Sequence, residues 1–244
     1  MLVKITSLLF CFLVTNAFAS SDAPKIAHFG SPHHDAIVRH LTENKAIVFA
    51  KPGAKGLIAF QALENKEVDF VILPSSTLYI TPIKDPEAFK FDPLKKFKVL
   101  GVIAELESGY YLSPKHKSLA ELKNKNGPIM HASGGSEAEM IIEETFNGKE
   151  VVHVNYRGIG QQLIDVKSGI ADITFVPLTF ASSSDLKPIP STRSIKLHFV
   201  TRHDISDSQI KEFKKLINRN INSSKVKEFS TATKTKFILL KDRE

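Results

Sequence analysis

Residues 128–146 read PIMHASGGSEAEMIIEETF, and this stretch decides how the chain is interpreted. An apolar start passes into small residues and then into an acidic segment, in which Ile141 and Phe146 recur at helical spacing. Ser136 and Glu139 have the S-x-x-E spacing of a capping box, which predicts that a helix begins there. The stretch therefore predicts a strand, a Ser/Gly loop and a helix, which is a building unit of α/β folds.

The predicted loop has the chemistry of an anion site. Backbone N–H groups at the start of a helix have no intrahelical partner and lie at the positive end of the helix dipole. Small residues in the loop also let a ligand approach the backbone closely. Glu137 and Glu139 would partly offset the positive end. An ordinary capped helix after a flexible loop is the alternative at this stage.

The segments before this stretch repeat the same order of elements. We expect a continuous apolar strand at residues 68–73, of the kind that is buried in parallel sheets. We expect residues 74–93 to form a long, polar surface connection. The remaining predictions for this part are strands at 25–29, 46–50 and 98–106, loops at 30–35 and 51–56, and helices at 36–43 and 57–66.

A second α/β unit is predicted from about residue 110 onward. Gly169 is placed to end one of its helices with a left-handed cap. Two α/β units joined by strand-like segments indicate two lobes with a cleft, where α/β folds usually bind ligands. The further predictions are strands at 151–156, 170–176 and 196–201, and helices at 118–123, 161–167 and 206–221.

The N-terminus has the pattern of a secretory signal peptide. Lys4 precedes a short apolar run at residues 7–14, and Ala17 and Ala19 form an A-x-A site. The run is too short to span a bilayer. We therefore expect residues 1–19 to be removed by cleavage after Ala19, and the mature protein to be periplasmic. Cys11, the single cysteine, would be lost with this segment, which excludes disulfides and thiol chemistry.

The charge of the chain does not indicate nucleic-acid binding. The formal net charge is +7, but lysines and arginines are scattered, and the densest cluster covers only residues 95–98. Such a surface is typical of a solvated exported protein. A general positive field would still attract anionic ligands.

Six segments, taken in order, resemble one protein family. In the substrate-binding receptors of tripartite tricarboxylate transporters, also called Bug proteins, the corresponding phrases run roughly PGAGG, YDPxxDFxPV, SLxEL, YGSAGxGS and VPYKGxxPALxDLxxGxVDxxF. The region from 151 to 175 is the most specific of the matching segments. These segments are KPGAKG (51–56), FDPLKKFKVLGVI (91–103), SLAELK (118–123), HASGGSEAE (131–139), VVHVNYRGIGQQLIDVKSGIADITF (151–175) and SDSQIKEFKKLINRNI (206–221).

The resemblance implies a two-lobe periplasmic binding protein of the type II α/β fold. The first lobe would contain residues 20–109 and 196–244, and the second lobe residues 110–195. Such a receptor is not an enzyme and needs no cofactor or metal. It captures a small organic acid in the cleft between its lobes and delivers it, as a monomer, to the membrane permease subunits of the transporter.

The resemblance also implies which residues contact the ligand. In relatives, ligand carboxylates meet the loop after the first strand, the PGAGG loop and the Ser/Gly loop, and the family's tyrosine and lysine follow a later strand. Carried over to this chain, the ligand-binding residues are Ser31, His33, His34, Asp35, Gly53, Ala54, Lys55, Gly56, Ser133, Gly134, Gly135, Ser136, Tyr156 and Arg157.

Some features depart from the family or allow another interpretation. Lys55 replaces a glycine of PGAGG, and the usually Pro- and Gly-rich first loop contains two histidines. The histidines at 28, 33, 34 and 40 could be metal ligands, but no acid or cysteine completes a ligand set at site spacing. A serine hydrolase is disfavoured because no G-x-S-x-G motif occurs. A sensory or scaffold protein that passes its signal to a membrane partner remains the alternative function.

Overall fold

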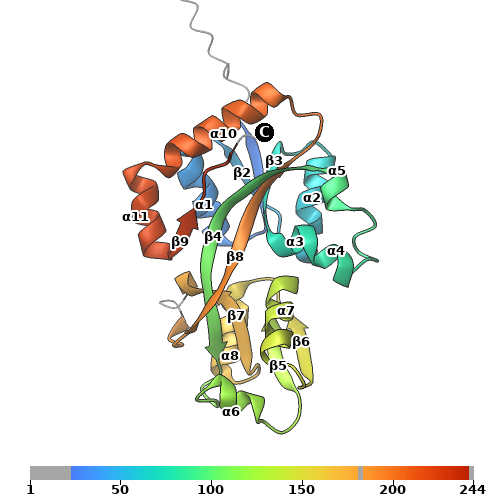
Figure 1. Ribbon diagram of the computed structural model, residues 1–244, viewed down its shortest axis with the longest axis vertical. Helices are drawn as coiled ribbons and strands as arrows, with labels where there is room; N and C mark the ends of the chain where they lie inside the picture. The colour runs from blue at the N-terminus through green and yellow to red at the C-terminus, as the bar shows by residue number, and fades with distance from the viewer. Residues whose placement is uncertain (1–22, 181–183, 242–244) are drawn as a thin grey trace, which may run out of the picture.

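The computed structural model describes residues 23–180 and 184–241. Its elements gather in two groups, an upper and a lower lobe in Figure 1, which are joined by two long strands, β4 (Lys98–Leu112) and β8 (Ile189–Thr201). The predicted signal peptide, residues 1–19, lies outside the described residues. No helix in the described ranges is long and apolar enough to cross a membrane.

The upper lobe is built on three parallel strands with β8 added antiparallel at one side. The order is β2–β1–β3–β8. The apolar run predicted at residues 68–73 forms a fully buried strand, as expected. The strands are β1 (Lys25–His28), β2 (Ile47–Ala50) and β3 (Phe70–Pro74). The helices are α1 (Pro32–Thr42), the 3₁₀ turn η1 (Ala54–Gly56), α2 (Leu57–Glu64), α3 (Ser75–Tyr79), α4 (Thr81–Lys84) and α5 (Pro93–Lys96).

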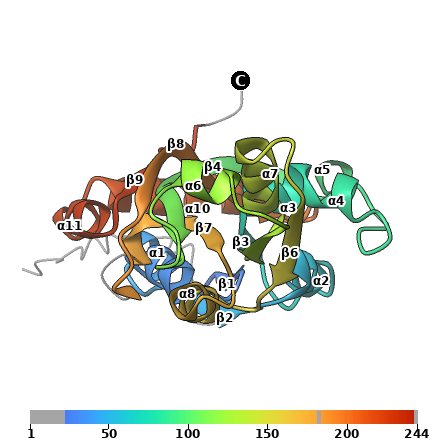
Figure 2. The same cartoon turned by 90° about the horizontal axis from the view of Figure 1, so that it is seen from below.

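The lower lobe repeats this arrangement with β4 as the antiparallel strand. The order is β6–β5–β7–β4. Figure 2 shows α7 and α8 on opposite sides of these strands. Gly169 ends α8 in the left-handed conformation, as predicted. The elements are α6 (Leu119–Lys123), β5 (Ile129–Ser133), α7 (Ser136–Thr145), β6 (Val151–Asn155), α8 (Ile159–Ser168), β7 (Ile173–Pro177) and the 3₁₀ turn η2 (Leu178–Phe180).

The two lobes share one hydrogen-bonded sheet. β4 and β8 pair antiparallel along most of their length and extend through both lobes, with register shifts that include one between Glu107 and Gly109. Because both strands run through both lobes, the strand pairing sets no boundary between the lobes. The lobe boundaries expected from the sequence therefore stay a prediction. The chain ends on the upper lobe with α10 (Asp207–Ile221), α11 (Ser224–Thr233) and β9 (Thr235–Phe237), and β9 pairs with β4.

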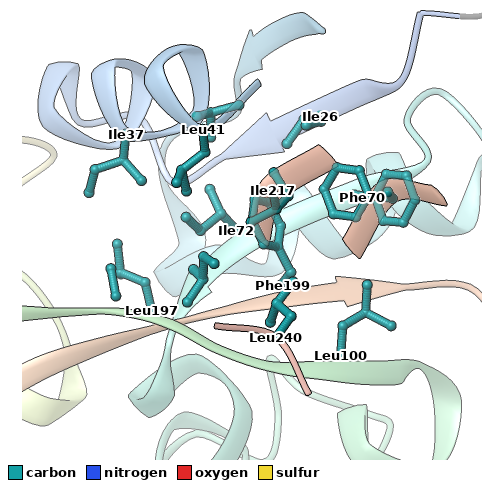
Figure 3. Close-up of a cluster of buried hydrophobic side chains, with 14 of the residues drawn as sticks. Ile26, Ile37, Leu41, Phe70, Ile72, Leu100, Leu197, Phe199, Ile217 and Leu240 are labelled. Carbon is teal, nitrogen blue, oxygen red and sulfur yellow. The ribbon is translucent and has the colours of Figure 1, made fainter. Parts of the chain in front are cut away.

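Alternating side chains of the upper sheet enter two separate cores. Ile72 and Phe199 point to the face covered by α1 and α10, where Ile37, Leu41 and Ile217 pack against them (Figure 3). Val71 and Leu73 point to the opposite face and pack with residues of α2. The lower strands are likewise covered by α7 on one face and α8 on the other. This packing fixes the ends of the strands, where the loops of the site begin.

Three local predictions were wrong. α1 begins at Pro32 rather than at residue 36, because Ser31 caps it and proline is favoured in a first turn, so His33, His34 and Asp35 are helical. The segment 74–93 is not only a connection, since it forms α3 and α4. The capping box of residues 136 and 139 is absent, because the N-cap of α7 is Gly135 and no side chain caps it.

Candidate functional site

A cavity of about 970 Å³ lies between the two lobes. The loops after β1, β2 and β3 line it from the upper lobe, and those after β5, β6 and β7 line it from the lower lobe. Leu106 of β4 and Ile195 of β8 line it as well. Ligands of open α/β sheets bind at the carboxyl ends of the strands, and here six such ends meet at one place.

Three helices of ten or more residues begin at the wall of this cavity, in the part of the chain that the structure describes. Their N-caps are Ser31 for α1, Gly135 for α7 and Gly158 for α8, and all three residues line the cavity. The Ser31 hydroxyl accepts a hydrogen bond from the backbone N–H of His33 (3.1 Å). α7 and α8 have no side-chain cap, so their first-turn N–H groups are left for another acceptor. Two uncapped helix starts favour a bound anion.

The serines of the Ser/Gly loop already have partners. The Ser133 hydroxyl donates to Glu139 Oε1 (2.8 Å) and accepts from the backbone N–H of Gly135 (3.2 Å). The Ser136 hydroxyl accepts from Thr81 Oγ1 (3.0 Å), which comes from α4 of the other lobe. Both serines are buried, and neither lines the cavity. Their hydroxyls therefore hold the loop and join the lobes, while the backbone of Gly134 and Gly135 faces the cavity.

Gly134 lies against a buried amide. A Cβ atom at this position would be 2.7 Å from Nε2 of Gln162, a residue that is 1% exposed and that also lines the cavity. Gln162 Oε1 accepts a hydrogen bond from Thr174 Oγ1 (2.9 Å), which holds the amide in place. Glycine at position 134 is thus required by close packing rather than by an unusual backbone angle.

The loop across the cavity contributes a cation. Lys55 lines the cavity, and its Nζ lies 3.9 Å from Glu139 Oε1 of the lower lobe. Gly53 also lines the cavity, whereas Gly56 packs against Thr77, whose hydroxyl donates to the carbonyl of Lys55 (3.2 Å). Ala54 lies in the same 3₁₀ turn.

The start of α1 contributes one histidine to the cavity. His34 lines it, with Nδ1 buried and lacking a hydrogen-bond partner in the described ranges, and burial lowers its pKa to about 3. His33 points elsewhere, since its Nε2 is 3.1 Å from Thr235 Oγ1. Asp35 is also directed away, to Arg39 (2.6 Å). His33 and Asp35 therefore support α1 rather than line the cavity.

Tyr156 and Arg157 line the cavity after β6. The Tyr156 hydroxyl donates to Asp165 Oδ2 (2.5 Å), and burial together with this hydrogen bond raises its pKa to about 12. Arg157 has no ion pair or hydrogen bond with the described residues. Lys167, a third cation at the wall, is paired with Asp185 (2.7 Å). Arg157 is thus the cation most available to an anionic ligand.

Glu137 is an acid in the wall of the same cavity. It is the second residue of α7, and its Oε2 atom is buried and makes no hydrogen bond to any described residue. Burial raises the pKa of this carboxyl to about 7, although Lys196 and Arg193 act in the opposite direction. Asp85 also lines the cavity, which therefore has two acidic residues in its wall beside the anion-binding amides.

The structure brings together only part of the predicted set. His33, Asp35, Gly56, Ser133 and Ser136 do not line the cavity. Sequence reasoning also missed lining residues that directly follow strand ends, a position that could have indicated them. The predicted residues that line the cavity are Ser31, His34, Gly53, Lys55, Gly134, Gly135, Tyr156 and Arg157, and the missed ones include Phe29, Ser76, Glu137, Asn155, Gln162 and Phe180.

Within the described ranges, His28 of β1 and the histidines of α1 contact groups other than a common metal site. His28 Nε2 is 3.6 Å from Asp35, and its Nδ1 is 3.1 Å from the backbone N of Gly30. His40 stacks on Phe229 at 4.3 Å between ring centroids. In the part of the chain that the structure describes, no group of three or more His, Cys, Asp or Glu side chains is arranged to hold a metal ion.

Solved structures similar to this chain are mainly those of solute-binding proteins. A structure described as a periplasmic transporter is 18% identical, with a TM-score of 0.76 over 90% of each chain. The periplasmic binding protein BugD is 13% identical, with a TM-score of 0.70 over 88% of each chain. MatC from Rhodopseudomonas palustris, solved with bound malate, is 14% identical, with a TM-score of 0.71 over 87% of this chain and 89% of that chain.

No protein-family model and no curated protein matches the chain. At these identities the structural likeness establishes the fold, which is the two-lobe α/β fold of type II periplasmic binding proteins. The fold class predicted from the sequence is therefore confirmed, and so, at the level of structure, is the resemblance to Bug-type receptors.

Proposed function

We propose that this protein is a periplasmic solute-binding receptor of the tripartite tricarboxylate transporter family, and that its ligand is a small organic carboxylate. The observation that carries the proposal is the cavity between the lobes, where the uncapped starts of α7 and α8 and the unpaired Arg157 meet. The malate bound to the structurally similar MatC supports this ligand class.

One carboxylate of the ligand is held by backbone amides, and Arg157 faces the second carboxylate of a ligand that has one. Charge-assisted hydrogen bonds contribute roughly 1.5–3 kcal/mol each, and micromolar affinity needs about 8 kcal/mol. The first-turn amides of α7 and α8 supply several donors, and Arg157 supplies a full charge. Lys55 adds a second cation for ligands with two carboxylates, although it is shared with Glu139.

Binding is coupled to the approach of the two lobes. Three polar contacts between described residues already join α7 to the upper lobe: the hydrogen bond from Thr81 to Ser136, the ion pair between Lys84 and Glu143 (2.7 Å) and that between Lys55 and Glu139 (3.9 Å). We propose that residues 20–109 with 196–244 and residues 110–195 move as two bodies about the β4–β8 ladder, which closes the cavity on the ligand.

The cellular part of the proposal is export and delivery to a permease. Cleavage after Ala19 would release a periplasmic monomer that hands its ligand to the membrane subunits of the transporter. Intact-mass analysis of the periplasmic fraction should give a chain that begins at Ser20. An uncleaved chain that stays in the cytoplasm would contradict this part of the proposal.

The ligand class is tested by binding. We would screen the purified protein by thermal shift against mono-, di- and tricarboxylates, and measure every hit by isothermal titration calorimetry. Bound ligand adds RT ln(1 + [L]/Kd) to the stability, about 2.7 kcal/mol at 100 times Kd. We expect at least one carboxylate to bind with micromolar affinity. A screen in which no carboxylate binds would refute a carboxylate receptor.

A further inference from the structure

Glu137 has no role in the function proposed above. That function explains why amides and cations line the cavity, but an acid beside an anion site opposes the binding of a simple carboxylate. The Oε2 atom of Glu137 is buried and makes no hydrogen bond in the described part of the chain. A buried carboxylate without a partner is costly, so an acid in this position indicates a group that is supplied by the ligand.

The neighbouring cations do not neutralise Glu137, because each is paired with another acid. Arg193 is paired with Glu144, and Lys196 Nζ lies 3.8 Å from Glu105 Oε1. Both basic residues are on β8 and act on Glu137 only through the electrostatic field. The ordinary partners of a buried acid are thus engaged elsewhere.

Glu139, two residues further along the same helix, shows the contrast. It is 6% exposed, accepts a hydrogen bond from Ser133 (2.8 Å) and has Lys55 at 3.9 Å. Glu139 does not line the cavity, whereas Glu137 does. Among the described residues, Glu139 thus has partners, whereas the Oε2 atom of Glu137, a residue of the cavity wall, has none.

We propose that Glu137 accepts a hydrogen bond from the protonated amino group of the ligand, so that this receptor selects amino acids over the corresponding acids that lack the amino group. The inference rests on the proposed function, since the carboxylate of the same ligand occupies the amides. The first-turn amides of α7 and the Glu137 side chain come from one turn of helix. An amino acid presents its carboxylate and its ammonium close together, which fits donors and an acceptor on one turn.

The ionisation of Glu137 is compatible with this role. Burial raises its pKa to about 7 in the empty cavity. An ammonium group nearby favours the charged form of a carboxyl and lowers its pKa. At pH 7.5 the side chain is therefore available as a charged acceptor, and binding of the amino group strengthens that state.

The test uses matched pairs of compounds that differ in the amino group alone. The pairs are aspartate and succinate, glutamate and glutarate, 2-aminoadipate and adipate, and phenylalanine and 3-phenylpropionate. Calorimetry at pH 7.5 on the mature protein should show that the amino member of the best pair binds at least tenfold more tightly. In E137Q this preference should fall to less than threefold.

E139Q is the matched control, because it removes an acid from the same helix without changing the cavity wall. Loss of the Glu139 charge can change the position of Lys55, but such a change affects the binding of both compounds of a pair. The ratio of their affinities should therefore stay as in the wild type. A thermal melt of each variant, compared with that of the wild type, shows that the variant is folded.

Each other outcome overturns the inference in a distinguishable way. If the compounds without an amino group bind as tightly as the amino acids, the proposed carboxylate receptor stands and the role of Glu137 is refuted. If glutarate binds more tightly as the pH falls from 8 to 6, with no preference for glutamate, Glu137 acts as a protonated donor instead. If no member of any pair binds, the inference is refuted, and the wider carboxylate screen decides separately whether the proposed function stands.

Discussion

Two glycine-containing loops meet at the cavity, and they bring opposite charges to it. The loop of residues 53–56 in the upper lobe presents Lys55, whereas the loop of residues 133–136 in the lower lobe leads into Glu137. The lower loop was predicted as an anion site from its own sequence pattern, and the upper loop was predicted to contact the ligand from the family resemblance. In both loops glycines line the cavity, and we infer that the charged residue within the upper loop and the one just after the lower loop select the ligand.

The largest expected effect comes from filling the lower loop. In Gly134→Val the new side chain meets the amide of Gln162, since a Cβ atom alone would lie 2.7 Å from Nε2. We expect the side chain to project into the cavity and to weaken ligand binding at least a hundredfold, which is about 2.7 kcal/mol. Calorimetry with the best carboxylate of the screen measures this loss.

Ala232→Val is the control for this experiment. Ala232 is exposed on α11 and does not line the cavity, so the same side chain is introduced away from the site. We expect the affinity of this variant to change less than tenfold. Equal affinities for Gly134→Val and the wild type would mean that the lower loop only begins a helix and does not hold the ligand.

The second prediction separates Glu137 from Glu139 through the pH dependence of stability. The folded-state pKa of Glu137 is raised from 4.5 to about 7, so between these values the folded state binds more protons than the unfolded state. The stability of the wild type therefore falls as the pH rises through this window. In E137Q the glutamine side chain does not titrate, so this fall in stability with rising pH is absent. Each pKa unit is worth about 1.4 kcal/mol, and with partial exposure we expect E137Q to be more stable by about 2 kcal/mol above pH 7.

Urea unfolding at pH 4, 6 and 8 measures this difference. E139Q should behave in the opposite way at neutral pH, because it removes the partner of Lys55 and an acceptor of Ser133. If E137Q gained no stability relative to the wild type between pH 4 and 8, Glu137 would be adequately solvated in the empty cavity.

The third prediction concerns the cation without a partner. Arg157→Ala should weaken dicarboxylates about tenfold and monocarboxylates less, because only a dicarboxylate has a second charge to satisfy. Arg39→Ala is the control, since Arg39 is paired with Asp35 and does not line the cavity. Calorimetry with one mono- and one dicarboxylate compares the two variants. Equal losses for both ligands would assign Arg157 to general attraction of anions.

The sequence predicted the lobes better than it predicted the side chains of the site. Strand and helix periodicity placed most elements, because buried strands such as residues 68–73 have a pattern that local sequence contains. Partners such as Thr81 for Ser136 come from another lobe, 55 positions away, and no local pattern contains them. The role proposed for Glu137 could not be predicted from local sequence either, because it depends on which nearby cations already pair with other acids.

The smallest predicted effect tests how the lower loop is held. In Thr81→Val the shape of the side chain is kept, but the buried Ser136 hydroxyl loses the donor that reaches it from the upper lobe (3.0 Å). Such a loss costs about 1 kcal/mol, so the midpoint of thermal unfolding should fall by about 2–4 °C. Thr231→Val is the control, since the Thr231 hydroxyl donates to Lys227 within α11, at the surface, and its loss should change the stability by less than about 0.5 kcal/mol. Equal melting midpoints for the two variants would show that the lower loop is held by contacts within its own lobe alone. The two loops would then differ in the charges that they bring to the cavity and not in how they are held in place.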